Sequence, residues 1–395
     1  MADIFSHPDV IIIGAGASGL MCAIEAGNRG RRVLCLDHGN TIAKKVLVSG
    51  GGNCNFTNRE ISPDHYESQN RHFCKSALAR YGQYNFLSLL DKHGISYHEK
   101  DSGRLFCNHS SKAIVKMLLD ECRKAGVVIR TECAIQKIWK DKAFYIETGC
   151  GDFLSESLVV ATGGLSYPGM GATGLGYRIA EQFGLAVVKP RPALVPLLFN
   201  DEDAKHFQGL QGITLDVEVR CRKKRFRDSL LFTHQGLSGP AILRISSFRY
   251  PNDPLTIDLL PDFNLAAYLK QQKSLRPESQ IKTLLAGRLP GRLAQRLCDL
   301  RVRKGPLGEI PDKELQKIDR LFHHWEWVPA GTAGYNRAEV TLGGVDTEAL
   351  SSKTMEAKEV KGLYFVGEVV DITGDLGGYN LQWAWSSGYC AGQYV

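Results

Sequence analysis

The segment from Asp9 to Asp37 limits the possible folds of this chain more than any other stretch. It reads as a buried strand, a glycine turn, a helix and a second apolar strand that ends in a carboxylate. Gly14, Gly16 and Gly19 form a G-x-G-x-x-G pattern. In that pattern the first glycine allows a tight turn, the second lets a pyrophosphate approach the backbone, and the third lets helix pack against strand. Asp37 then lies where it can accept hydrogen bonds from ribose hydroxyls.

The flanking elements decide what this glycine pattern means. Ala17 and Ser18 open the expected helix, and the amides of a helix N-terminus bind phosphate groups. A glycine pattern by itself is weak evidence, but here both strands and the acid are in register. The segment therefore predicts an α/β, Rossmann-like domain that binds an adenine dinucleotide, in preference to an ordinary tight turn.

Composition predicts a soluble, cytoplasmic protein of two or three domains, because 395 residues suffice for a large core. The eleven cysteines are scattered, odd in number and without C-x-x-C or zinc-like spacing, which predicts reduced thiols and no metal site. The N-terminus MADIFSHPDV has no basic region, and its first apolar run breaks at Gly14. The sequence therefore supports neither a signal peptide nor a membrane span.

The formal net charge of +7 is modest for this length, yet cations crowd into one short segment. This basic cluster consists of Arg220, Arg222, Lys223, Lys224, Arg225 and Arg227. A solvated protein face is the interpretation that such a run favours. Two alternatives stay open, an anion site for a phosphorylated cofactor and a surface that faces RNA, because both require clustered cations.

Periodicity divides the remaining sequence into a discontinuous cofactor domain and an insert. After the first strand-helix-strand unit come a glycine-rich loop at Ser49–Asn58 and helical patterns at Lys75–Leu90 and Ser111–Ala125. Short alternating strands at Thr131–Val160 predict an antiparallel meander. The first part of an FAD-binding domain, a parallel sheet plus this meander, is thus expected over residues 1–189.

A break at Lys189–Pro196 marks the start of the insert, which we expect over residues 190–330. Its pattern is β-rich over 190–261 and helical over 262–330, where Leu, Ala, Arg and Lys dominate. Glycine-rich, strand-like sequence then returns and runs to the C-terminus. Residues 331–395 are therefore expected to complete the FAD-binding domain.

Two C-terminal motifs suit the flavin end of such a cofactor. Lys361–Glu368 reads as a strand that ends in glycine and a carboxylate, and in flavoproteins a carboxylate at such a strand end accepts hydrogen bonds from ribityl hydroxyls. Gly377–Gly388 reads as a glycine turn that opens a helix, whose N-terminal amides would favour the anionic reduced flavin. The alternative for Glu368 is a surface residue that merely follows a strand.

Five stretches of the chain together resemble a known family. They are SGGGNCNFTN, LVVATGGLSYPGMGATGLGY, FTHQGLSGPAILRIS, TLGGV and GLYFVGEVVDITGDLGGYNLQWAWSSG. The sequence resembles the YhiN-like flavoproteins, also called the BaiN/RdsA family of NAD(P)/FAD-dependent oxidoreductases, over essentially its whole length. The resemblance implies a two-dinucleotide-binding FAD fold of the glutathione reductase and fumarate reductase group, with a β-barrel-like insert, a helical insert and noncovalent FAD.

The expected FAD contacts extend beyond the glycine turn and Asp37. We expect them at Lys45, Ser49, Gly50, Gly51, Asn53, Ala134, Ala161, Thr162, Gly163, Gly164, Gly367, Glu368, Gly378, Tyr379, Asn380 and Leu381. No histidine lies between Asn40 and Gly52, where fumarate reductase relatives attach their flavin. A second G-x-G-x-x-G at Pro168–Gly174 follows SYP and not a clean strand, which argues against a separate NAD(P) domain.

Two residues are candidates for catalysis, each with a plainer alternative. Cys54 lies in the loop that carries a redox cysteine pair in glutathione reductase relatives, but Ser49 and Arg59 occupy the positions where its partner would lie. A dithiol relay is thus excluded, and Cys54 could line the flavin or simply pack. His234 could act as a general acid toward a substrate carbon, or its ring could be satisfied by backbone hydrogen bonds in a turn.

The leading functional hypothesis is an FAD-dependent oxidoreductase. In it a donor such as NAD(P)H reduces the flavin, which passes hydride to an unsaturated or carbonyl-bearing small molecule. An RNA-acting flavoprotein is the first alternative, because related folds modify tRNA and the basic cluster could follow phosphates. A non-enzymatic flavin-binding protein is the second. No membrane partner is expected.

Overall fold

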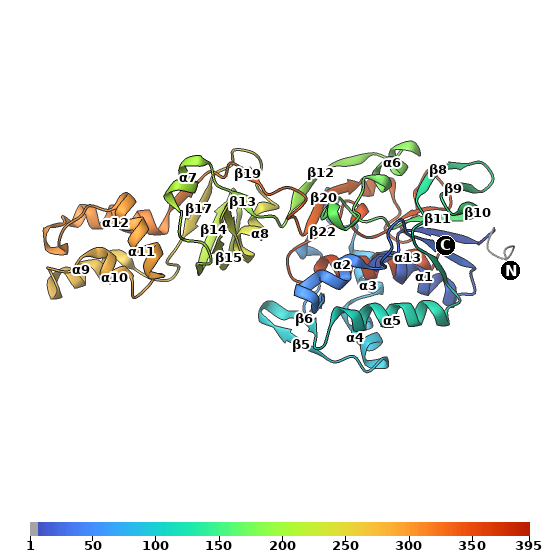
Figure 1. Ribbon diagram of the computed structural model, residues 1–395, viewed down its shortest axis with the longest axis horizontal. Helices are drawn as coiled ribbons and strands as arrows, with labels where there is room; N and C mark the ends of the chain where they lie inside the picture. The colour runs from blue at the N-terminus through green and yellow to red at the C-terminus, as the bar shows by residue number, and fades with distance from the viewer. Residues whose placement is uncertain (1–6) are drawn as a thin grey trace. The chain divides into compact units, whose positions relative to one another are not determined.

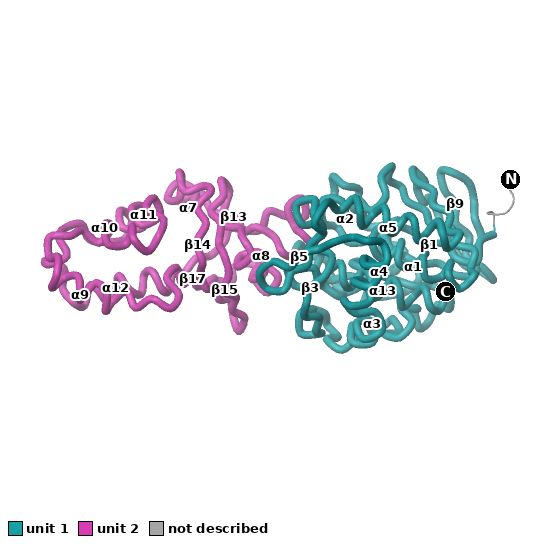
Figure 2. The backbone as a smooth tube through the Cα atoms, turned by 90° about the horizontal axis from the view of Figure 1, so that it is seen from below, with its two compact units in different colours: residues 1–192, 340–395 teal, residues 193–339 magenta. Residues whose placement is uncertain are grey.

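The computed structural model describes residues 7–395, which form two compact units (Figure 2). Of the described residues, the first unit contains 7–192 and Val340–Val395, and the second contains Ala193–Glu339. The first residues of MADIFSHPDV, on which the expected absence of a signal peptide partly rests, lie outside the described residues. Within the described part of the chain, no helix has the length and apolar character needed to cross a membrane.

A parallel sheet of five strands forms the centre of the first unit (Figure 1). Its order is β21-β11-β1-β2-β7, with β1 at Val10–Ile13, β2 at Val33–Leu36, β7 at Val128–Arg130, β11 at Ser157–Val160 and β21 at Leu363–Phe365. Every residue of β1, β2, β11 and β21 is buried. Such continuous burial is characteristic of a parallel sheet covered on both faces. The expected Rossmann-like α/β architecture is confirmed.

Two helices from opposite ends of the chain pack closely beside this sheet. They are α1 (Ala17–Asn28), which connects β1 to β2, and α13 (Tyr379–Gly392), which is buried along most of its length. A Cβ atom on Gly388 would lie 2.3 Å from the Ser18 carbonyl oxygen, and one on Gly392 would lie 2.9 Å from the Cys22 carbonyl oxygen. Only glycine at these α13 positions allows the two helices to approach this closely.

An antiparallel meander adjoins this sheet in the sequence. It contains β8 (Ile135–Lys140), β9 (Phe144–Thr148) and β10 (Gly151–Ser155). The expectation of a meander reaching Val160 is wrong for the last strand, because β11 pairs in parallel with β1 and β21. The meander also joins Cys133 to Cys150 in a disulfide, so the expectation of reduced thiols is wrong for this pair. The other nine cysteines are free and buried.

The remaining elements of the first unit surround the sheet. They are α2 (Lys44–Val48), η1 (Ser49–Gly52), β3 (Asn55–Asn58), η2 (Pro63–His65), β4 (Tyr66–Glu67), α3 (Lys75–Arg80), α4 (Gln83–Lys92), β5 (Tyr97–Lys100), β6 (Arg104–Cys107), α5 (Ser111–Lys124), α6 (Leu175–Gln182), β12 (Val187–Ala193), β20 (Val340–Val345), η7 (Gly367–Val369) and β22 (Thr373–Gly374). The helical pattern at Lys75–Leu90 is two helices, because the backbone at Gly82 is extended. The predicted break at Lys189–Pro196 begins inside β12. Among residues 7–395 this strand pairs with β20 alone, so it is an edge strand that tolerates prolines.

The second unit is built on an antiparallel sheet of seven strands with its own hydrophobic core. The sheet order is β18-β17-β14-β15-β16-β13-β19, comprising Trp325–Trp327, Leu255–Asp258, Thr214–Cys221, Lys224–Phe232, Gly236–Ser238, Leu197–Leu198 and Gly331–Thr332. Its helices are α7 (Asp201–His206), α8 (Pro240–Ser246), α9 (Leu265–Leu275), α10 (Ile281–Leu285), α11 (Gly291–Arg301) and α12 (Asp312–His323). The second unit thus extends to Glu339, past the expected limit at 330. That this unit is an independent domain stays a prediction.

The close crossing of α1 and α13 can be tested with one methyl group. Gly388→Ala should lower the free energy of unfolding by about 1–3 kcal/mol, because the new Cβ overlaps the Ser18 carbonyl and forces the helices apart. Gly291→Ala is the control for adding a methyl group to a helical glycine, since Gly291 is the first residue of α11 and no atom of the described residues lies within 4 Å of a Cβ there. Thermal unfolding in excess FAD should separate the two variants. Equal melting temperatures would contradict the crossing.

Candidate functional site

The glycine turn between β1 and α1 is built from two close contacts and one open position. A Cβ atom on Gly14, whose φ is +109°, would lie 2.4 Å from the Ala161 carbonyl oxygen, and one on Gly19 would lie 1.9 Å from the Gly14 carbonyl oxygen. These contacts lock the turn onto β11 and α1 onto the turn. Within residues 7–395, by contrast, nothing lies within 4 Å of a Cβ on Gly16. Open space therefore adjoins the backbone at the middle glycine.

The N-terminus of α1 adjoins that space. Within the described residues it has no side-chain cap and no acidic residue in its first turn. The first amides of a helix carry partial positive charge and need acceptors. An uncapped N-terminus beside an open glycine suits a phosphate group. Ala17 and Ser18, expected to contact the cofactor, supply the first two residues of this helix.

Asp37 holds the turn from the end of β2. Its carboxylate oxygens accept hydrogen bonds from the Ala15 amide at 2.8 Å and the Gly39 amide at 2.7 Å. The Gly14 amide also donates to the Leu36 carbonyl at 2.7 Å. Each carboxylate oxygen has a second lone pair that remains available to another donor. Asp37 can therefore stabilise the turn and still accept a bond from a ribose hydroxyl.

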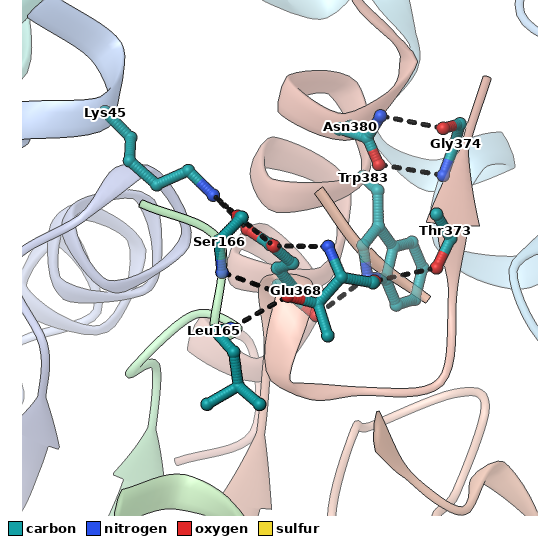
Figure 3. Close-up of polar contacts among 10 residues, drawn as sticks. Lys45, Leu165, Ser166, Glu368, Thr373, Gly374, Asn380 and Trp383 are labelled. Atoms are coloured by element: carbon teal, nitrogen blue, oxygen red, sulfur yellow. Dashed lines mark hydrogen bonds and ion pairs between the residues drawn. The ribbon is translucent and has the colours of Figure 1, made fainter. Parts of the chain in front are cut away.

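A polar network around Glu368 joins distant segments of the first unit (Figure 3). Glu368 accepts hydrogen bonds from Lys45 Nζ at 2.6 Å, Ser166 Oγ at 3.0 Å and the Thr341 amide at 2.9 Å. Lys45 Nζ also donates to Ser166 Oγ at 2.7 Å. With its side chain 19% exposed, Glu368 is not a free surface carboxylate. A Cβ on Gly164 would lie 2.6 Å from Glu368 Oε1, which explains that glycine.

The backbone brings these groups together. The Ala43 amide donates to the Ala15 carbonyl at 3.0 Å, which attaches the start of α2, and with it Lys45, to the glycine turn. Thr341 Oγ1 accepts from the amides of Leu165 at 2.8 Å and Ser166 at 3.2 Å. The segment after β11 is therefore fixed against β20 and η7, and the carboxylate and ammonium groups lie within one cluster.

The turn that opens α13 is closed by its own side chains. Asn380 Oδ1 accepts from the Gly374 amide and Asn380 Nδ2 donates to the Gly374 carbonyl, both at 2.8 Å (Figure 3). A Cβ on Gly378, whose φ is +93°, would lie 2.3 Å from the Thr57 carbonyl oxygen. Asn380 therefore shapes the turn, while the α13 N-terminus, like that of α1, lacks a side-chain cap within the described residues.

An aromatic pair adjoins this turn and was not anticipated from the sequence. The His65 and Tyr379 rings stack with centroids 4.4 Å apart and an interplanar angle of 19°. The His65 carbonyl accepts from the Asp375 amide at 2.8 Å, and Tyr66 Oη donates to the Tyr379 carbonyl at 3.0 Å. No motif in the sequence marks His65 as a site residue. The pairing of β4 with β22 brings it to α13.

The other expected contacts fall into open and packed positions. Gly51 and Gly163 have positive φ, and within the described residues a Cβ on either meets nothing within 4 Å. A Cβ on Gly50, in contrast, would lie 2.8 Å from the Asn55 amide nitrogen. Five further residues expected to contact FAD already make interactions within the protein. Ser49 Oγ donates to a backbone carbonyl, and the Asn53 and Ala134 carbonyls accept from backbone amides. The Gly367 amide donates to Ser387 Oγ, and Leu381 packs on the core. The side-chain oxygen of Thr162 is buried without a partner among residues 7–395.

The first unit therefore fits FAD by the chemistry of its groups. Two uncapped helix N-termini supply partial positive charge, two carboxylates can accept from ribose and ribityl hydroxyls, and open glycines leave space beside the backbone. The individual FAD contacts stay a prediction. The second G-x-G-x-x-G forms a 3-10 turn, η4 (Pro168–Met170), which a loop separates from β11 and which precedes α6. It does not form a second strand-turn-helix unit.

The two candidate catalytic residues differ in their surroundings. Cys54 has no exposed surface, and burial raises the pKa of its thiol to about 12, so the thiol is protonated near neutral pH. This supports the packing alternative for Cys54. His234 is exposed in the turn between β15 and β16, where Thr233 Oγ1 donates to the Gly236 carbonyl at 2.8 Å. Thr233 rather than His234 closes that turn, and catalysis by His234 stays a prediction.

Comparisons with known proteins identify the family. The model of the HI0933-like protein Rossmann domain matches residues 8–394. The chain belongs to this family. It is 48% identical over 400 residues to a ribosomal RNA dihydrouridine synthase of Escherichia coli (strain K12), covering 98% of this chain and 97% of the relative. It is 29% identical over 403 residues to the 3-dehydro-bile acid delta(4,6)-reductase of Clostridium scindens, covering 97% of each.

A solved structure shows the same fold. The 3-ketosteroid-delta4-(5alpha)-dehydrogenase from Rhodococcus jostii RHA1 aligns with a TM-score of 0.51 and 13% identity, over 99% of this chain and 98% of that one. The family resemblance seen in the sequence is confirmed, and the chain is an FAD-dependent oxidoreductase. The hypothesis of a non-enzymatic flavin-binding protein is therefore wrong.

The role of Asp37 can be tested by titration with FAD. Asp37→Ala removes a charged acceptor, and such hydrogen bonds contribute roughly 1.5–3 kcal/mol each, so FAD should bind about tenfold to 150-fold more weakly. Asp9→Ala is the matched control, because Asp9 lies at the opposite end of the parallel strands and pairs with Arg32. Unchanged FAD affinity in Asp37→Ala would show that the adenosine end of the site lies elsewhere.

Proposed function

We propose that this protein reduces uridine to dihydrouridine in ribosomal RNA, with noncovalent FAD as cofactor and NAD(P)H as electron donor. The observation that carries this proposal is the 48% identity, over 98% of the chain, to ribosomal RNA dihydrouridine synthases of Escherichia coli and Haemophilus influenzae. Identity to the bile acid reductase is 29%. The proposal therefore prefers an RNA substrate to the small molecule that the sequence favoured.

The reaction sets clear requirements for the protein. Reduction of the uracil C5=C6 bond adds a hydride to one carbon and a proton to the other, and NAD(P)H is oxidised to NAD(P)+. Bound FAD supplies the hydride. The protein must hold the cofactor, position the base and deliver the proton. The glycine turn, Asp37 and the α13 N-terminus suit the first task through their amides and carboxylate.

His65 is the residue that we assign to proton delivery. Its ring stacks on Tyr379, the first residue of α13, and its carbonyl is held by the Asp375 amide. The amides of α13 are expected to face the flavin pyrimidine, so this imidazole belongs to the flavin end of the site. Imidazole suits proton transfer near neutral pH better than any other side chain. Cys54 is less suitable because its buried thiol holds its proton.

Reduction of a small unsaturated molecule is the second candidate, and the similarity to the bile acid reductase favours it. The same cofactor site would serve both reactions, because each adds a hydride and a proton across a conjugated double bond. The two candidates differ only in which acceptor reoxidises the flavin.

A nucleoside assay separates these candidates. Protein loaded with FAD and supplied anaerobically with NADPH should convert uridine in a ribosomal RNA transcript to dihydrouridine, seen by mass spectrometry after digestion. A transcript with cytidine in place of the reacting uridine is the control. Failure on every ribosomal RNA fragment, together with rapid flavin reoxidation by unsaturated ketones, would favour the small-molecule reaction.

Replacement of His65 tests the proton donor. His65→Gln should lower kcat for dihydrouridine formation by about a hundredfold to ten-thousandfold, the usual contribution of a positioned acid. FAD content and flavin reduction by NADPH should stay as in the wild type, because neither step requires that proton. His72→Gln is the control, since His72 is exposed in the same segment. Full turnover in His65→Gln would assign the proton to another group.

A further inference from the structure

The basic cluster forms part of an ordered surface in the second unit. A tight turn at Arg222 and Lys223 joins β14 to β15. The cations therefore lie at the tip of this hairpin and on the strand residues next to the tip. Arg222 has a φ of +53°, in a region where turns favour glycine. Its side chain is held in place by an ion pair with Asp253 and by the Tyr250 ring.

Cations and aromatic rings alternate across this surface. Arg222 lies over the Tyr250 ring at 4.4 Å, Lys224 over the Phe248 ring at 4.2 Å, and Arg244 over the Phe226 ring at 4.2 Å. The Phe226 and Phe248 rings are 5.6 Å apart. We call these six side chains, together with Lys223 and Arg225, the hairpin face. It combines the turn between β14 and β15, strand β15, helix α8 and the loop that follows α8. Arg225 lies on the opposite side of β15 from Lys224 and Phe226, so the cations line both sides of the hairpin near its tip.

Two cations of the hairpin face are not balanced by its acids. Arg222 pairs with Asp253 at 2.7 Å, and the neighbouring Arg220 and Arg227 pair with Glu218, Asp216 and Asp262. Within residues 7–395, no ion pair involves Lys223 or Arg225, and both are exposed. Arg225 also lies directly across from Arg220 in the strand register. Like charges opposite each other in a sheet are unfavourable, and a bound anion relieves the repulsion.

We propose that the hairpin face is a binding surface for single-stranded RNA, in which Lys223, Lys224 and Arg225 contact phosphates and the Tyr250 ring stacks with a base. The proposal rests on the proposed function, because it names how an RNA substrate is held. Proteins bind unpaired RNA by combining a cationic track with aromatic platforms. Tyr250 is 50% exposed, so one part of its ring is available beside Arg222.

This chemistry distinguishes RNA from other anionic partners. An acidic peptide would be attracted by the cations but gains little from half-exposed aromatic rings between them. A nucleic acid uses both, since phosphates neutralise the cations and bases stack on rings and guanidinium planes. The sequence favoured a solvated face for the basic cluster. The aromatic rings that lie beside its cations come from a distant part of the sequence, and they favour an RNA-binding surface instead.

The experiment compares two triple variants of the full-length, FAD-loaded protein. Lys223→Gln/Lys224→Gln/Arg225→Gln removes the proposed phosphate contacts. Arg301→Gln/Arg303→Gln/Lys304→Gln is the matched control, because it removes the same charge from exposed positions elsewhere in the second unit. Binding to a fluorescent single-stranded ribosomal RNA fragment is measured by anisotropy over a range of KCl concentrations. FAD content and melting temperature establish that both variants are folded.

The hairpin variant should bind RNA with a salt slope smaller by about two, since each lost phosphate contact on a single strand removes about 0.7. The control should keep a slope close to that of the wild type. Tyr250→Ser should weaken binding about fivefold or more without changing the slope, because a stacked base is lost and no counterion is involved. An equal loss of slope in both triple variants would overturn the proposal. So would a hairpin variant that binds RNA as tightly as the wild type but no longer binds poly-glutamate, because the surface would then recognise an acidic peptide.

The outcome separates this inference from the proposed function. Dihydrouridine formation with wild-type RNA affinity in the hairpin variant would overturn the binding surface and leave the function standing. Loss of RNA affinity in the hairpin variant supports the surface even if the wild-type protein forms no dihydrouridine. In that case the proposed function fails alone.

Discussion

Contacts between backbones, possible only at glycine, hold the cofactor unit together. Gly19 packs on Gly14, Gly14 packs on Ala161, and Gly388 packs on Ser18, each so closely that a Cβ would overlap a carbonyl group. These contacts fix β1, β11, α1 and α13 at distances that no side chain permits. The N-terminus of α1 and the end of β11 therefore meet around one turn, and Gly16 remains the open position beside it.

Charge within this frame is arranged as a network rather than as isolated pairs. A partly buried ion pair is costly to desolvate, and it persists only when further hydrogen bonds satisfy its remaining lone pairs and protons. Lys45 and Glu368 meet this condition, because Ser166 bonds both and the Thr341 amide donates to the carboxylate. The network ties the N-terminal third of the chain to the C-terminal segment across η7, next to the turns expected to hold FAD.

Much of the parallel sheet could be predicted because its signals are local. The glycine pattern and Asp37 lie within one strand-helix-strand unit, and their spacing follows from the geometry of the turn. The meander was extended too far because β11 was read together with the alternating strands. Its residues are all buried, whereas β9 alternates between buried and half-buried, and that difference indicates a parallel strand covered on both faces. The Cys133–Cys150 disulfide escaped prediction because spacing alone does not reveal the meander turn that brings the thiols together.

Local sequence determines that this chain contains a Rossmann-like turn with an acid-tipped second strand, and its motifs together determine the family. Tertiary structure alone decides which polar groups meet. Ser166 and Thr341 reach Glu368, His65 reaches Tyr379, and the cations of the hairpin face reach Phe248 and Tyr250, because strands far apart in the chain pair and pack. Such contacts leave no periodic signal, since each depends on the burial of whole elements and not on the spacing of neighbouring residues.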